Sequence, residues 1–298
     1  MLRFGLLGTG YWAAQTQAAG LAEHPDARFV GVWGRNPARV RALADRYAVR
    51  GYEDVDALLA DVDAVAIALP PDVQAPLAVR AARAGRHLLL DKPVALTVGA
   101  ADEIVAALDA EGLSSLVFTT NRYRPEVDAF LTEAGRTGGW YAGHVTMYGA
   151  NFVPGSPYAD SPWRDEYGGL WDLGPHALSL VVPVLGPVVE VAALAGAHRT
   201  HHVLARHASG AASTLHLSIH LTPGAVRWET RFAGPDGWVT VPTGVDAVAA
   251  FRVAVARLAR NVADGITRDP LDVRAGRDAV AVLAAAQTAA DQGRTVRL

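Results

Sequence analysis

Two segments of the sequence gather residue types that can transfer a proton and stabilise charge on an oxygen. Asp91-Lys92-Pro93 follows a short apolar run, and residues 163–176 collect aromatic, glycine and charged residues and include Asp172 and His176. Oxidation of an alcohol requires one group that accepts the hydroxyl proton and another that stabilises the developing oxyanion, besides a cofactor that takes hydride. We therefore predict Lys92 and His176 for these two tasks, with Asp172 as a further candidate catalytic residue beside His176.

The same segments also allow less specific interpretations. A lone surface lysine is usually inert, and a histidine at a helix start is often held by packing alone. Asp172 and His176 are four residues apart, which places both on one face if the segment is helical throughout. Pro175 makes a helix start near His176 equally compatible with the sequence. The spacing therefore leaves their contact open.

A glycine-rich loop near the start of the chain indicates a cofactor. Gly8, Gly10 and Ala13 occupy the positions of a Gly-x-Gly-x-x-Gly/Ala loop, after an apolar run at residues 3–7 and before a predicted helix through about Glu23. Such a loop turns tightly against a pyrophosphate, and the helix start supplies N–H donors and a positive dipole end. The pattern alone also occurs in ordinary turns, but its place in a strand–helix–strand unit predicts a dinucleotide site.

The end of the second predicted strand, residues 28–33, favours one dinucleotide over the other. A carboxylate there would bind the adenosine ribose hydroxyls and favour NAD, but the strand is followed by Gly34, Arg35 and Asn36. Arg35, with Arg39 one helical turn further, can pair with a 2′-phosphate. We predict NADP in preference to NAD. The alternative is that both arginines are solvated surface charges.

The elements around these residues predict two domains. Further strands are expected at 63–69, 87–90 and 113–119, alternating with helices at 36–47, 72–84 and 97–111. Short apolar strands between amphipathic helices are typical of an α/β doubly wound parallel sheet, a Rossmann domain that we assign to residues 1–120.

From about residue 120 the pattern changes to strands that alternate polar and apolar residues. Leu215, Leu217 and Ile219 face one way, and the polar residues between them face the other. This pattern predicts an α+β domain over residues 121–298 with a mostly antiparallel, open sheet. Strands are expected at 142–151, 188–197, 201–206, 211–221 and 226–233, and helices at Val245 to Asp264 and Asp272 to Gln292.

Composition narrows the class of protein. The 298 residues are 51% hydrophobic, which is enough for a sizeable core, and the net charge of −3 without a basic stripe argues against a nucleic-acid partner. The absence of cysteine removes disulfides and thiolate chemistry. No stretch predicts a signal peptide or a membrane span, so we expect a cytoplasmic protein without a membrane partner. The five histidines between residues 201 and 220 lack a clustered carboxylate, and we predict no metal.

Five motifs together carry a family resemblance. They are Gly8-x-Gly10-x-x-Ala13, Asp91-Lys92-Pro93, Asn121-Arg122-Tyr123-x-Pro125, Trp163-Arg164, and Gly168-Gly169 leading to Asp172-x-Gly174-x-His176. Over essentially its whole length the chain resembles the Gfo/Idh/MocA family, which includes glucose-fructose oxidoreductase and inositol dehydrogenase. The resemblance implies an NAD(P)-dependent reaction on a sugar, polyol or related hydroxyl or carbonyl compound. It also implies a homodimer or homotetramer formed through the C-terminal sheet.

The resemblance further implies a set of site residues. Lys92 and His176 would act at the reacting oxygen, with Asp172 positioning the substrate or the histidine. The substrate contacts would be Lys92, Arg122, Tyr123, Asp172 and His176. The cofactor contacts would be Gly8, Gly10, Tyr11, Trp12, Ala13, Arg35, Asn36, Arg39, Leu69, Pro70, Gln74, Asp91, Lys92, Asn121, Trp163 and Arg164.

Three positions depart from the family pattern. Asp91 stands where the family has glutamate, Gln74 where many relatives have histidine, and Ser179 where an acidic residue is frequent. Two other functions remain open: a non-catalytic protein that senses a dinucleotide, and a glycosidase that uses tightly held NAD for transient oxidation. The presence of Lys92, Asp172 and His176 favours the oxidoreductase.

Overall fold

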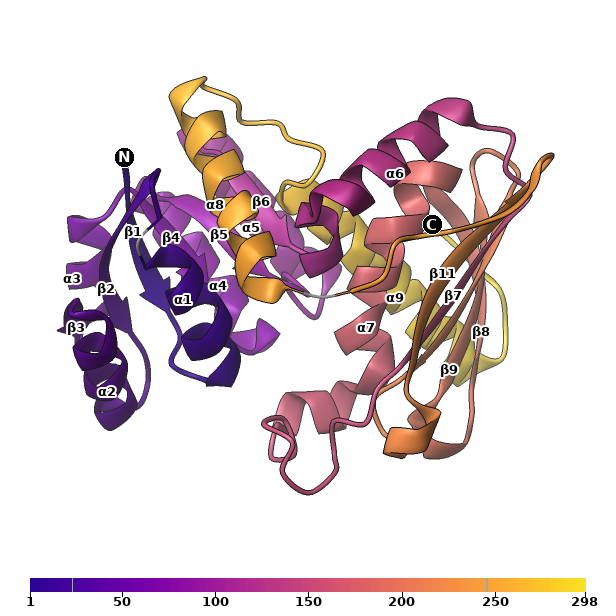
Figure 1. Cartoon of the computed structure of the whole chain (residues 1–298), viewed down its shortest axis with the longest axis horizontal. Helices are drawn as coiled ribbons and strands as arrows, with labels where there is room; N and C mark the ends of the chain where they lie inside the picture. Colours follow the sequence, from indigo (N-terminus) through magenta and orange to yellow (C-terminus); the bar gives the residue numbers. More distant parts are fainter. Residues whose placement is uncertain (23, 245) are drawn as a thin grey trace. The chain divides into compact units, whose positions relative to one another are not determined.

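The computed structural model describes residues 1–22, 24–244 and 246–298. Positions 23 and 245, where we expected a helix end and a helix start, lie outside the described residues. The chain divides into two compact units, Met1–Tyr123 with Asp246–Arg277 and Arg124–Val245 with Asp278–Leu298 (Figure 1). The first division lies close to residue 120, but the second unit is not the continuous stretch 121–298 that we expected, because residues 246–277 return to the first unit.

The first unit contains a six-stranded sheet in the order β3-β2-β1-β4-β5-β6, with all strands parallel. This confirms the predicted doubly wound parallel sheet. The strand order reverses between β1 and β4, and ligands of such sheets bind at the carboxyl ends of the strands beside this point. The strands are β1 (Leu2–Leu7), β2 (Ala27–Trp33), β3 (Arg50–Tyr52), β4 (Ala64–Ile67), β5 (His87–Asp91) and β6 (Ser115–Phe118).

Helices of the first unit connect these strands. The path from β1 to β2 and the path from β4 to β5 run in opposite directions along the sheet, so right-handed crossovers place their helices on opposite faces. The helices are η1 (Ala13–Gln17), α1 (Ala18–Leu21), α2 (Pro37–Tyr47), α3 (Val55–Asp61), α4 (Pro71–Arg83), α5 (Val98–Glu111), η2 (Thr120–Tyr123) and α8 (Ala247–Ala263). Two of these helices have side-chain caps: the Asn36 side chain accepts from the Arg39 N–H and that of Thr97 from the Ala100 N–H.

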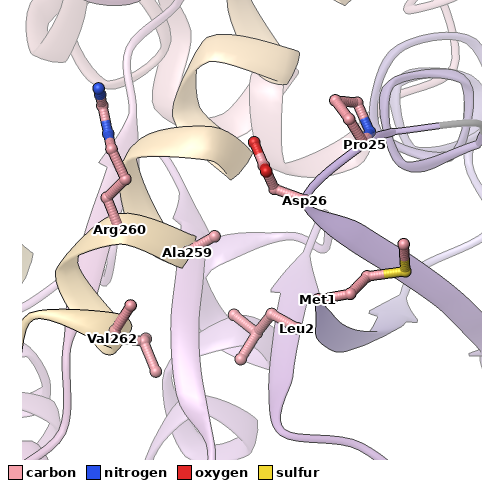
Figure 2. Close-up of a pocket in the computed structure, with 8 residues that line it drawn as sticks. Met1, Leu2, Pro25, Asp26, Ala259, Arg260 and Val262 are labelled. Atoms are coloured by element: carbon pink, nitrogen blue, oxygen red, sulfur yellow. The ribbon is translucent and has the colours of Figure 1, made fainter.

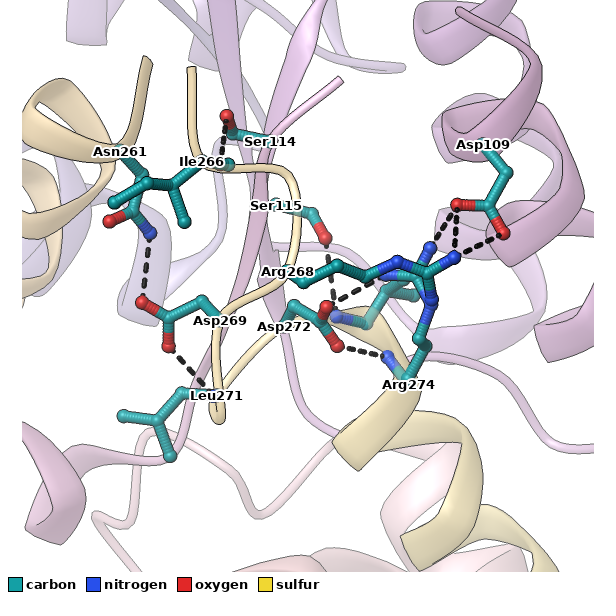
Figure 3. Close-up of polar contacts among 11 residues, drawn as sticks. Asp109, Ser114, Ser115, Asn261, Ile266, Arg268, Asp269, Leu271, Asp272 and Arg274 are labelled. Carbon is teal, nitrogen blue, oxygen red and sulfur yellow. Dashed lines mark hydrogen bonds and ion pairs between the residues drawn. The ribbon is translucent and has the colours of Figure 1, made fainter. Parts of the chain in front are cut away.

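The segment 246–277 belongs to the first unit for packing reasons. Phe251 of α8 is fully buried, and its ring meets Phe118 of β6 edge-on with centroids 5.0 Å apart. After α8 the chain runs along β6, where the Val117 N–H donates to the Leu271 carbonyl over 2.8 Å. Asp269 accepts bonds from Asn261 and from the Leu271 N–H (Figure 3). This segment therefore covers the outer edge of the parallel sheet.

A pocket of about 350 Å³ lies in the first unit where β1 and β2 begin (Figure 2). It is lined by Met1, Leu2, Pro25 and Asp26, together with Ala259, Arg260, Val262 and Ala263 from the end of α8. The glycine loop follows the opposite end of β1. The pocket is therefore separate from the edge of the sheet that carries the predicted site.

The second unit contains a seven-stranded sheet in the order β12-β11-β7-β10-β9-β8-β13. Only the β7–β10 pair is parallel among the pairs of the described strands, which confirms a mostly antiparallel sheet. Leu215, Leu217 and Phe232 are buried on one face, while His202 and Leu204 are exposed on the other. The strands are β7 (Ala142–Tyr148), β8 (Val188–Ala195), β9 (His201–His207), β10 (Ala212–Ser218), β11 (Arg227–Gly234), β12 (Gly237–Thr240) and β13 (Val296–Arg297).

Two helices, α6 (Pro125–Thr137) and α7 (Pro162–Leu185), belong to this unit, and α9 (Val273–Gln292) begins in the first unit and continues in the second. Helix α7 packs on β7 and β10. It is kinked at Gly168, whose φ of 62° lies in the left-handed region. The second helical part of α7 therefore starts at Gly169 and carries both Asp172 and His176.

Candidate active site

The two glycines of the glycine loop, Gly8 and Gly10, differ in their backbone conformation and in the space around them. Gly8 has a φ of +137°, and a Cβ there would stand 2.4 Å from the Ala68 carbonyl oxygen, so the turn needs glycine. A Cβ on Gly10 would meet no atom of the described residues within 4 Å. The space above Gly10 is therefore open to a ligand that approaches the backbone.

The helix after this loop begins with a π-helical turn, in which the Ala18 N–H donates to the Ala13 carbonyl oxygen. Such turns are frequent at functional sites. The Trp12 ring stacks on Phe118 with centroids 6.3 Å apart, and its buried Nε1 has no hydrogen-bond partner among the described residues. Open space at Gly10 and an unused buried donor at Trp12 fit a bound dinucleotide.

The residues after β2 lie beside the glycine loop, since a Cβ on Gly34 would contact Thr9 at 2.8 Å. Arg35 and Arg39 are exposed, and neither forms an ion pair with the described residues. The Asn36 side-chain oxygen is used as the cap of α2, over 3.1 Å to the Arg39 N–H. Two cations at this edge are compatible with a 2′-phosphate.

Lys92 follows β5, at the same sheet edge as the glycine loop. The Lys92 N–H donates to Asp91 Oδ1 over 2.9 Å, and Pro93 and Val94 behind it are buried. Leu69 and Pro70, which we predicted as cofactor contacts, are half-buried at the end of β4 and the start of α4 on this edge. The carboxyl edge of the sheet therefore collects the glycine loop, residues 69–70 and Lys92.

Two residues predicted as ligand contacts, Gln74 and Tyr123, are buried and bond the backbone of neighbouring segments. Gln74 is 0% exposed, and its side chain bonds the backbone of residues 91–94, so it holds the Lys92 loop instead of facing a cofactor. Tyr123 is 2% exposed, and its hydroxyl donates to the Val117 carbonyl over 3.0 Å, which places it in the core. Arg122 is also buried, while Asn121 is half-buried; both lie in η2, directly after β6.

The second unit carries Asp172 and His176. Because both lie in the continuous helix after Gly168, they are one turn apart on the same face. A contact between the two side chains stays a prediction. Asp172 is 4% exposed, and its Oδ2 accepts from Arg164 Nε over 3.3 Å and from Asn151 Nδ2 over 3.4 Å. A buried carboxylate with these two donors is held in one orientation.

Arg164 is positioned by its neighbours within the second unit. Its guanidinium lies 4.5 Å from the Tyr158 ring centroid and 4.6 Å from that of Trp163, and Nη1 reaches Ser161 Oγ over 3.3 Å. Arg164 thus bonds Asp172 in this structure, and its contact with a cofactor stays a prediction. Sequence reasoning missed Asn151 and Tyr158; the only signal was that Asn151 ends a predicted strand and that Tyr158 lies in the stretch following it.

The Ser179 hydroxyl proton is already used, because Oγ donates to the His176 carbonyl over 2.7 Å within α7. Among residues 1–22, 24–244 and 246–298, no group of three His, Asp or Glu side chains is arranged to hold a metal ion. In the same part of the chain, no helix is long and apolar enough to cross a bilayer.

Comparison with known proteins gives matches along most of the chain. The sequence model of the oxidoreductase family with an NAD-binding Rossmann fold, GFO_IDH_MocA, matches residues 2–119. The GFO/IDH/MocA C-terminal domain matches residues 131–240. The two matched ranges contain the glycine loop, Lys92, Asp172 and His176.

Individual relatives are similar over part of their length. A dTDP-3,4-didehydro-2,6-dideoxy-alpha-D-glucose 3-reductase from Streptomyces antibioticus is 30% identical over 196 residues, 64% of this chain and 59% of the relative. An inositol 2-dehydrogenase from Rhizobium meliloti is 40% identical over 97 residues, 32% of this chain and 29% of the relative. The chain thus spans less than two thirds of these relatives.

A solved structure shows that the fold extends over the whole chain. The WlbA dehydrogenase from Bordetella pertussis, in complex with NADH and UDP-GlcNAcA, superposes with a TM-score of 0.83 at 22% identity and covers 100% of this chain and 98% of that chain.

Proposed function

Because the chain belongs to the Gfo/Idh/MocA family of oxidoreductases, we propose that it transfers hydride between NAD(P) and a carbon of a sugar, polyol or related hydroxyl or carbonyl compound, in the cytoplasm. The observation that carries the proposal is the carboxyl edge of the parallel sheet, where the open glycine loop and Lys92 come together. The reductase and the inositol dehydrogenase among the relatives indicate this class of substrate.

The composition of the chain adds an argument for Lys92. It is the only lysine among the 27 Lys and Arg residues of the sequence. All the other residues of this set are arginines, so the lysine at position 92 supports a role that arginine does not fill. A compact ammonium that can donate or release a proton is such a property, because a guanidinium stays protonated.

Each proposed role follows from the chemistry of the side chain. NAD(P), when bound, accepts or supplies the hydride. Lys92 stabilises charge on the reacting oxygen, and His176 accepts the hydroxyl proton during oxidation and returns it during reduction. Asp172, held by Arg164 and Asn151, orients the substrate or His176 from one helical turn away.

Nicotinamide absorbance with a panel of polyols, sugars, keto-sugars and nucleotide sugars tests the proposal. We expect turnover with at least one compound, and Lys92→Ala and Lys92→Arg should each lower kcat/KM by about 10²–10⁴-fold, the usual range for proton-transfer groups. Ser179→Ala is the control, because the Ser179 hydroxyl bonds the backbone of its own helix. Absence of turnover across the panel, or an unaltered rate in Lys92→Ala, would refute the proposal.

We also propose that NADP is the preferred cofactor, supported by the exposed Arg35 and Arg39 and by the lack of a carboxylate at residues 34–36. Calorimetric dissociation constants for NADP and NAD test this. Arg35→Ala should weaken NADP binding by about 10-fold, as expected for loss of a charge-assisted bond, and leave NAD binding unchanged. Arg28→Ala, an exposed arginine in β2, is the control. Equal binding of both cofactors, or equal effects of Arg35→Ala on both, would contradict the preference.

The open face of the second sheet supports a homodimer or homotetramer. Leu204 is 53% exposed and Trp238 56% exposed on this face, and the nearby carboxylates are already paired with arginines, as Glu229 is with Arg231. Such a partly apolar face, whose carboxylates are paired, suits an identical surface. Sedimentation should show an oligomer that Leu204→Glu dissociates and that Val253→Glu, in α8 of the other unit, leaves intact. A monomeric wild-type protein would exclude the assembly.

A further inference from the structure

The loop that carries Lys92 is held by a single buried side chain from α4. Gln74 Oε1 accepts from the Asp91 N–H over 3.0 Å. Its Nε2 lies 2.8 Å from the Asp91 carbonyl oxygen and 3.0 Å from that of Pro93, with the Val94 oxygen at 3.4 Å. One amide group therefore bonds the backbone on both sides of Lys92.

On the β4 side the sheet does not supply these bonds, although Asp91 still pairs with Phe118 of β6 on the other side. Strand β4 ends at Ile67, which pairs with Leu90, so the backbone from Asp91 onward has no partner from β4. Buried N–H and C=O groups need partners, and Gln74 supplies them from the helix that follows β4. Pro93 has no N–H, and the Lys92 N–H is taken by the Asp91 carboxylate. Gln74 and Asp91 thus fix the backbone from which the Lys92 side chain extends.

We propose that Gln74 is a positioning residue for Lys92, acting through the backbone of residues 91–94; this inference rests on the proposed function. A lysine side chain has four rotatable bonds, so the place of its ammonium depends on where its backbone is anchored. A misplacement of about 1 Å at a reacting centre can lower a rate by about 10²-fold. Loss of the Gln74 bonds should therefore reduce kcat while cofactor affinity is retained.

Two substitutions of similar length separate the hydrogen bonds from the shape. Gln74→Met removes the hydrogen bond that the side chain accepts and those that it donates. We expect kcat to fall by about 10–100-fold at every pH. Gln74→Glu keeps the acceptor but faces the carbonyl oxygens of Asp91 and Pro93 with a carboxylate. Protonation of that carboxylate restores one donor, so the activity of Gln74→Glu relative to wild type should recover as the pH falls.

The control for these substitutions is a variant that loses a buried hydrogen bond elsewhere in the same unit. Ser114 is 2% exposed in the same unit and donates to the Ile266 carbonyl over 2.7 Å (Figure 3). Ser114→Ala should lower the melting temperature without lowering kcat. In a Lys92→Ala background, Gln74→Met should cause no further loss of rate, because positioning acts only through the lysine.

The single lysine gives a readout that does not need turnover. Protein labelled with ¹³C-lysine yields one lysine spectrum, that of Lys92. Its side-chain chemical shifts should change in Gln74→Met and stay constant in Ser114→Ala. Unchanged shifts together with an unchanged kcat in Gln74→Met would overturn the inference. A wild-type protein without turnover whose Lys92 shifts still respond to Gln74 would instead refute only the proposed function.

Discussion

At the scale of single residues, substitution of the two glycines of the glycine loop should have different effects: one on stability and the other on ligand binding. Gly8→Ala forces a Cβ against the Ala68 carbonyl at a φ of +137°, and we expect a loss of about 1–3 kcal/mol in the free energy of unfolding. Gly10→Ala meets open space and should change that free energy by less than about 0.5 kcal/mol. It should nevertheless lower dinucleotide affinity at least 10-fold, because the added methyl group occupies the ligand's approach.

Urea unfolding and calorimetric titration with NADP and NAD distinguish the two effects. Ala14→Gly in the helix that follows serves as a control for a simple change of helix propensity, worth about 1 kcal/mol. If Gly10→Ala binds both dinucleotides as tightly as the wild type, the loop is an ordinary turn and the cofactor is held elsewhere.

The sequence indicated candidate residues for this site but not the partners that hold them. Gly8, Lys92 and His176 were predicted because their types and spacing carry chemistry. The placement of Gln74 depends on the end of a neighbouring strand, and that of Arg164 depends on Asp172 eight residues later in a kinked helix. Such contacts arise from tertiary neighbours, and no local pattern encodes them.

At the scale of elements, the segment after α8 should be held by Asp269. Its carboxylate, 6% exposed, accepts two bonds of 2.8 Å from Arg257 and one each from Asn261 and the Leu271 N–H. Asp269→Ala should destabilise the protein by about 2–4 kcal/mol, because it breaks a largely buried ion pair. It should also speed hydrogen exchange in β6, whose edge this segment covers.

Arg136→Ala is the control, since its ion pair with Glu133 is exposed and worth at most about 1 kcal/mol. Equal effects of the two substitutions would show that the segment is held by apolar packing alone.

The same segment shows what patterns along the chain leave undetermined. A helix was predicted over residues 245–264, and α8 spans Ala247–Ala263, but a helical pattern does not specify which sheet the apolar face covers. Its place in the first unit follows from Phe251 meeting Phe118. The short strands β3, β12 and β13 were not predicted, because two to four residues give too little periodicity.

At the scale of the whole molecule, the half-buried His87 and the buried His207 make stability depend on pH. In the first unit, burial lowers the pKa of His87, whose Nδ1 accepts from the Ser114 N–H. In the second unit, burial lowers the pKa of His207, which bonds the Gly186 carbonyl and Ser213 Oγ. Each ring is held neutral by its surroundings. A proton therefore binds the unfolded chain, where the pKa is near 6.5, more readily than the folded protein.

The free energy of unfolding should consequently be highest above about pH 7 and fall as the pH drops through 6.5 towards the lowered values. Urea unfolding at intervals between pH 8 and 5 measures this slope. His207→Gln offers a donor and an acceptor but no titrating group, so its slope should be shallower while its stability at pH 8 stays lower than that of the wild type. If stability remained level or rose over this range, these histidines would be as easily protonated in the folded protein as in the unfolded chain.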